Sequence, residues 1–121
     1  MTTILVVDDD AEIVDLLESV LDAAGYHVLT AVDGEALDIA RAARPDLILL
    51  DIMMPGMDGA EVSRRLRADP ETATIPIILI SAHHRLQSTG AALPVNDHLA
   101  KPFDLQDLYQ TVARWTNAGA P

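Results

Sequence analysis

Five polar side chains each follow an apolar stretch of this 121-residue chain, and their types could do chemistry together. They are Asp8, Asp9, Asp51, Ser81 and Lys101. Converging carboxylates repel one another, and a hard divalent cation such as Mg²⁺ relieves that repulsion by taking their oxygens as ligands. A cation flanked by an ammonium and a hydroxyl suits the oxygens of a phosphoryl group. Because carboxylates can act as nucleophiles toward phosphorus, Asp51 is the candidate phosphoacceptor.

Lys101 is the only lysine of the chain, since the other seven of its eight basic residues are arginines. An ammonium is a compact charge on a flexible stem, which differs from the planar fork of a guanidinium. Taken singly, each polar residue has a structural explanation: a lone acid after a strand is usually a helix cap, and a lone lysine is usually solvated. Only the joint arrangement favours a functional site.

Strands and helices alternate along the chain, and together they would position these side chains. Runs of mostly apolar residues predict strands at 4–7, 27–32, 47–50 and 76–80, with a shorter and weaker one at 98–100. Apolar residues at helical spacing, with capping residues, predict helices between Asp10 and Gly25, at 34–44 with Asp33 as cap, at 59–68, and after Asp104. This alternation is typical of a doubly wound parallel α/β sheet with helices on both faces, a (βα)5 arrangement. Polar residues that follow its strands then gather at one edge.

The segment between Ser81 and Lys101 departs from this regularity. It contains Gly90 and Pro94, both unfavourable inside a helix, and it lacks a continuous apolar face. We therefore expect the fourth helix to be short, displaced or irregular.

Composition narrows the class of protein. Length and a hydrophobic content of 50% predict one folded domain over 1–121, with 117–121 as a flexible tail. A net charge of −11 argues against nucleic acid as a direct partner. The chain has no cysteine, no signal-peptide pattern and no stretch long enough to span a membrane, which fits a cytoplasmic protein without a membrane partner.

Four motifs occur together in the order and at the strand ends typical of one family. They are "ILVVDDD", "LLDIMMPGMDG", "ILISA" and "KPF". With them the chain resembles the receiver domain of two-component response regulators over essentially its whole length. The resemblance implies a five-stranded flavodoxin-like sheet of order 2-1-3-4-5, for which a chemotaxis member of this family is a standard example. It also implies a cis bond between Lys101 and Pro102.

The resemblance also assigns roles to the candidate residues. Asp51 would accept the phosphoryl group, and Asp8, Asp9, Asp51 and the carbonyl of Met53 would hold Mg²⁺. Lys101 would pair with the phosphoryl group or with Asp51, and Ser81 would turn to hydrogen-bond a phosphoryl oxygen. His98 stands where an aromatic switch residue is usual. The Met53 side chain offers no base to activate water, which favours a long-lived phosphoryl group.

The function so implied is that of a phosphorelay receiver. A sensor histidine kinase or a histidine phosphotransfer protein would donate the phosphoryl group from a phosphohistidine, and the receiver would switch conformation to control an unknown downstream protein. The domain would catalyse its own phosphorylation and dephosphorylation without being a conventional turnover enzyme.

Other classes of protein have specific requirements. A haloacid-dehalogenase-type phosphatase needs a second acid two residues after its nucleophile, where this chain has Met53. A flavodoxin-like mononucleotide binder needs a phosphate-cradling loop after the first strand, where the acidic run from Asp8 to Asp10 repels phosphate. A pseudo-receiver, which would act as a phosphorylation-independent interaction module, stays open as the alternative.

Overall fold

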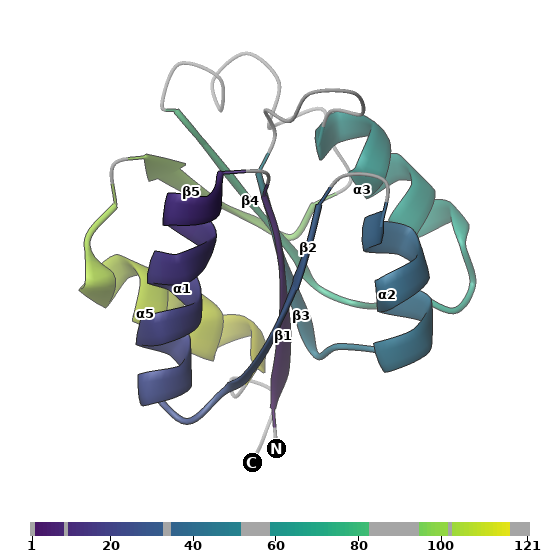
Figure 1. Cartoon of the computed structure of the whole chain (residues 1–121). Helices are drawn as coiled ribbons and strands as arrows, with labels where there is room; N and C mark the ends of the chain where they lie inside the picture. Colours follow the sequence, from purple (N-terminus) through teal and green to yellow (C-terminus); the bar gives the residue numbers. More distant parts are fainter. Residues whose placement is uncertain are drawn as a thin grey trace.

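Five parallel strands form a single sheet with helices packed on both faces (Figure 1). The structure, a computed structural model, describes residues 2–8, 10–32, 35–51, 59–82, 95–101 and 103–116, with 59, 60, 81, 82, 98, 100 and 101 described by their backbone only. The elements are β1 (Thr3–Val7), α1 (Ala11–Ala23), β2 (His27–Ala31), α2 (Ala36–Ala43), β3 (Leu47–Asp51), α3 (Gly59–Ala68), β4 (Ile77–Ala82), β5 (Asp97–Lys101) and α5 (Leu105–Thr116).

The strand order is β2-β1-β3-β4-β5, and every neighbouring pair is parallel. This order confirms the predicted doubly wound fold. Figure 1 shows α1 and α5 on one face of the sheet and α2 and α3 on the other. All five β3 residues are buried, as expected of a central strand that is covered on both faces.

Two apolar cores, one on each face, explain why the central strands are apolar without alternation. Successive side chains of a strand point to opposite faces, so each strand supplies both cores. Leu5, Val7, Ile48 and Leu50 pack in the core that includes residues of α2 and α3. Ile4, Val6, Leu47 and Leu49 pack in the core that includes residues of α1 and α5.

The ends of α1 agree with their sequence signals. The Asp10 side chain accepts a hydrogen bond of 3.0 Å from the backbone N–H of Glu12, which satisfies a donor of the first turn. Gly25 follows the helix with a φ of 99°, a conformation that glycine adopts at little cost. Asp104 caps α5 in the same way, through a bond of 2.7 Å from the N–H of Asp107.

Some boundaries and one buried face differ from the predictions. The helix α2 begins at Ala36, two residues later than predicted, and its N-cap position is Glu35. The strand β5 has five residues, so it is not shorter than β1, β2 or β3. Leu16 belongs to the apolar pattern that predicts the first helix, yet its side chain is 47% exposed.

Several predictions lie outside the described residues: the Asp33 cap, the irregular fourth helix, the cis bond to Pro102 and the flexible tail. Within the described part of the chain, no helix is long and apolar enough to cross a bilayer.

Candidate functional site at the carboxyl ends of the strands

The strand register brings the predicted site residues to one edge of the sheet. Val7 of β1 pairs with Leu50 of β3, so Asp8 and Asp51 follow equivalent positions on neighbouring strands. Neighbouring strands lie about 4.8 Å apart, which puts the backbones of these two aspartates within roughly 5 Å. Two carboxylates therefore leave the sheet side by side.

Both aspartates are buried, although charged side chains usually lie in solvent. Asp8 is 2% exposed and Asp51 is 6% exposed. The Asp8 carboxylate accepts a hydrogen bond of 2.9 Å from the backbone N–H of Asp10, and its own N–H donates to the carbonyl of Ala31. Burial of a charged group is costly unless partners compensate for the lost water, so a buried carboxylate pair points to a special role.

Ser81 and Lys101 lie on the next two strands at the same edge. Asp51 pairs with Ile80 of β4, which places the Ser81 backbone one residue further along. Lys101, at the end of β5, pairs with Ala82. Two strand spacings, roughly 10 Å, separate the backbone of β5 from that of β3.

The remaining predicted residues divide into two groups. Asp9 and Met53 lie outside the described residues. His98 is the second residue of β5, opposite Leu79, and so lies near the start of the strand rather than at the end that carries Lys101. Among the described residues, no three acidic or histidine side chains come together as a complete metal site. Asp8 and Asp51 form the part of the predicted ligand set that the structure describes.

A small cleft beside Asp8 was not anticipated from the sequence. It has a volume of about 240 Å³ and is lined by Asp8, Ala11, Val14, Asp15, Thr30, Ala31, Val32 and Glu35. Two of these lining residues are hydrogen-bonded to each other: the backbone N–H of Val32 donates to the Glu35 carboxylate at 3.4 Å. One wall of the cleft consists of residues 11, 14 and 15, whose helical spacing could have indicated that they share one side of α1. The opposite wall comes from β2 and the residues after it, and the sequence contains no signal that these two walls meet.

The chain belongs to the response regulator receiver domain family, whose profile matches residues 4–113. It is thus a receiver domain of two-component signalling. Response regulator PleD of Caulobacter vibrioides is 48% identical over 118 residues, which cover 93% of this chain and 26% of PleD. The chain spans about half or less of the length of the curated relatives it matches.

Solved receiver domains have the same fold. The signal receiver domain of a signal transduction histidine kinase from Syntrophus aciditrophicus has a TM-score of 0.91 at 30% identity, covering 99% of this chain and 93% of that one. The receiver domain of sensor histidine kinase PA1611 from Pseudomonas aeruginosa has a TM-score of 0.88 at 32% identity, covering 95% and 97%. That domain was crystallised with a magnesium ion coordinated in its active site cleft.

Proposed function

We propose that this domain accepts a phosphoryl group on Asp51 from a phosphohistidine of a sensor histidine kinase or a histidine phosphotransfer protein. One observation carries the proposal: the buried Asp51 carboxylate lies beside Asp8, at the edge where Ser81 and Lys101 lie near the ends of β4 and β5. Membership of the receiver family supports the same function.

The transfer is a single displacement at phosphorus. An Asp51 carboxylate oxygen attacks the phosphorus atom, the new P–O bond forms, and the P–N bond to the histidine of the donor breaks. The bonding electron pair returns to the imidazole nitrogen, which takes up a proton. The product is an acyl phosphate on Asp51, and catalysis rests on positioning and on charge stabilisation around the phosphoryl oxygens.

The donor set of this edge fits a magnesium ion. Asp8 and Asp51 supply hard carboxylate oxygens from neighbouring strands, and Asp9 and the carbonyl of Met53 would complete the set. When bound, Mg²⁺ supplies positive charge that compensates the carboxylates and the phosphoryl oxygens. The magnesium ion in the similar PA1611 receiver supports this assignment.

The chain's own residues would then divide the remaining work. The ammonium of Lys101 would pair with the phosphoryl group, and the hydroxyl of Ser81 would hydrogen-bond one of its oxygens. Movement of Ser81 toward that oxygen would vacate space that His98, on the neighbouring strand, could enter. We propose this movement as the switch that alters binding of a downstream protein, in the cytoplasm.

Phosphorylation by a small-molecule donor tests the proposal directly. We expect wild type incubated with acetyl phosphate and Mg²⁺ to gain the mass of one phosphoryl group, and Asp51→Asn to gain none. The matched control is Asp46→Asn, because Asp46 precedes the same strand at the opposite edge and binds the N–H of Thr3 through a carboxylate oxygen that asparagine can replace. This control should be phosphorylated as fully as wild type.

Two outcomes would refute the proposal. Phosphorylation of the Asp51→Asn variant would show that another residue accepts the phosphoryl group. A wild type that gains no mass from acetyl phosphate, and none from a phosphorylated histidine kinase, would favour the pseudo-receiver, whose interactions do not require phosphorylation.

A further inference from the structure

The arginines of this chain gather on one face, a distribution that phosphoryl transfer does not explain. Five of the eight basic residues lie in segments 36–44 and 59–71, which form α2, α3 and the turn after α3: Arg41, Arg44, Arg64, Arg65 and Arg67. The same segments contain four acids: Asp38, Glu61, Asp69 and Glu71. Five positive and four negative charges give this α2–α3 face a net charge of +1, in a chain whose total is −11.

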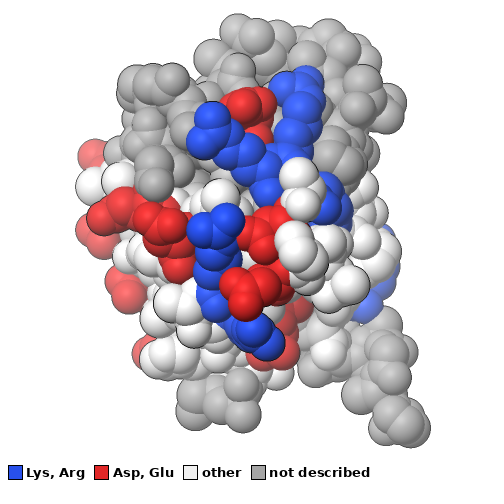
Figure 2. Space-filling model, turned by 90° about the vertical axis from the view of Figure 1, so that its right-hand side faces the viewer, with Lys and Arg blue, Asp and Glu red and all other residues white. Residues whose placement is uncertain are grey.

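Other described surfaces have the opposite balance. The helix α1 contains four acids and no basic residue. The helix α5 with its cap contains two acids, Asp104 and Asp107, and one arginine. Figure 2, which looks onto the side of the molecule at the right of Figure 1, shows basic and acidic side chains interleaved across the α2–α3 face.

Ion pairs follow one another along this face. Near the start of α3, Arg64 and Arg65 lie 3.8 and 3.3 Å from the Glu61 carboxylate. Arg41 of α2 binds Asp69 just after α3, and Arg44 lies 3.1 Å from Glu71 beyond it. Each of these four arginine side chains remains between 47% and 67% exposed, so their guanidinium groups can still reach a partner.

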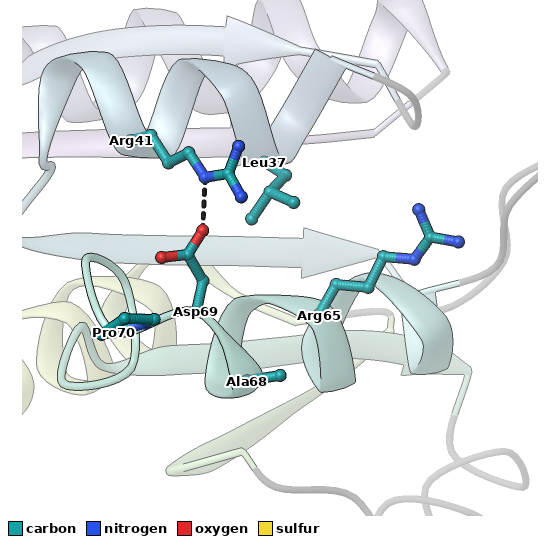
Figure 3. Close-up of a pocket in the computed structure, with 6 residues that line it drawn as sticks. All are labelled: Leu37, Arg41, Arg65, Ala68, Asp69 and Pro70. Atoms are coloured by element: carbon teal, nitrogen blue, oxygen red, sulfur yellow. Dashed lines mark hydrogen bonds and ion pairs between the residues drawn. The ribbon is translucent and has the colours of Figure 1, made fainter.

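A groove lined by both apolar and charged residues lies among these charges. Its volume is about 350 Å³, and it is lined by Leu37, Arg41, Arg65, Ala68, Asp69 and Pro70. In Figure 3 the Arg41 guanidinium meets Asp69 across the groove beside Leu37, whereas the Arg65 guanidinium is directed away from Asp69. Apolar residues surrounded by exposed arginines resemble the composition of protein interfaces, in which arginine is enriched and lysine is depleted.

We propose that two copies of this chain associate through the α2–α3 face. Two copies with a charge of −11 each repel, but the α2–α3 face, unlike α1 and unlike α5 with its cap, has no net negative charge that would add to this repulsion. The face carries both signs in alternation, so a two-fold contact can set the arginines of one copy against the acids of the other. In such a contact, an exposed arginine side chain of one copy can enter the groove of the other copy. The apolar part of that side chain can then pack on Leu37 and Pro70.

Sedimentation of the unphosphorylated protein tests this proposal independently of phosphoryl transfer. We expect the average mass of wild type to rise with concentration from 13.0 kDa toward twice that value. Arg65→Glu should weaken the association about tenfold or more, because it places like charges at the contact. The matched control is Arg114→Glu on α5, since Arg114 is also exposed, also pairs with an acid and produces the same change in net charge. It should weaken association less than about twofold.

Cross-linking gives a second readout, because the chain contains no cysteine. Ala68→Cys, in the groove, should form disulfide-linked pairs under mild oxidation more readily than Gln110→Cys, which places the thiol on an exposed position of α5. Faster cross-linking at position 110, or equal weakening by the two arginine variants, would overturn the proposal. A wild type that stays monomeric yet binds poly-glutamate through Arg65 would assign the face to an acidic partner and would overturn it as well.

Discussion

Removal of one buried carboxylate should stabilise the protein in the absence of divalent cations. Asp8 and Asp51 are almost fully buried on neighbouring strands, with backbones roughly 5 Å apart. At an effective dielectric constant of about 20, two carboxylates about 5–7 Å apart repel by about 2–3 kcal/mol. Hydrogen bonds such as the one from Asp10 to Asp8 offset part of this repulsion. We therefore expect Asp8→Asn, which keeps an acceptor oxygen, to raise the free energy of unfolding by about 1–3 kcal/mol.

Magnesium should cancel or reverse the difference in stability between wild type and Asp8→Asn. A ligand that binds only the folded state at about 100 times its dissociation constant adds roughly 2.7 kcal/mol to stability. Wild type should gain about this amount, and Asp8→Asn should gain much less because it lacks one of the proposed ligands. For a domain of this size, 1–3 kcal/mol corresponds to a change of about 4–12 °C in Tm.

Thermal unfolding followed by circular dichroism, with and without Mg²⁺, measures both effects. The control is Asp15→Asn, which removes one negative charge from the exposed surface of α1 near the same edge. It should match wild type within about 0.5 kcal/mol in both conditions. The reasoning fails if Asp8→Asn is less stable than wild type without Mg²⁺, or if Mg²⁺ raises the Tm of both proteins equally.

Three further predictions concern contacts away from the site. Asn96→Ala should lower the free energy of unfolding by about 1–3 kcal/mol in a denaturant titration, because the Asn96 side chain accepts the N–H of Ile77 at 2.9 Å and a guanidinium of α3. Asp97→Ala should shift the emission of Trp115, the only tryptophan, since its indole N–H donates to Asp97 at 2.8 Å; unchanged emission would contradict this. The N–H of Glu71 and then the Arg41 guanidinium hold the pKa of Asp69 below its ordinary value of 3.8, so its stabilising effect should be present above about pH 4 and lost as pH falls through the lowered pKa. Asp69→Asn should remove that part of the acid dependence.

Much of the sheet was predictable from the sequence, because a strand that is buried on both faces consists almost entirely of apolar residues. Strands β1 and β3 are continuous apolar runs, and their ends were located within one residue. The fifth strand was underestimated because its end residues, Asp97 and Lys101, are polar. Arg114 and Trp115 of α5 donate hydrogen bonds to Asp97. The hydrophobic pattern of the strand itself contains no signal for such a contact with a distant helix.

The candidate site was predictable only as a set of strand ends. Parallel strands put their carboxyl ends at one edge, so Asp8, Asp51, Ser81 and Lys101 could be grouped before any distance was known. The ion pairs between α2 and α3 could not be anticipated, because Arg41 and Asp69 are 28 residues apart and their meeting depends on how two helices pack.

The position of β1 within the sheet has a consequence for folding kinetics. β1 pairs on one side with β2, 24 residues later, and on the other with β3, 43 residues later. The entropic cost of closing these two loops differs by only about 0.5 kcal/mol, so loop length has little influence on whether β2 or β3 pairs with β1 first during folding. The difference in burial favours β3, because every residue of β3 is buried whereas β2 is largely half-buried or exposed. We expect the transition state for folding to contain the β1–β3 pair, so that Ile48→Val slows folding while Val28→Ala mainly speeds unfolding.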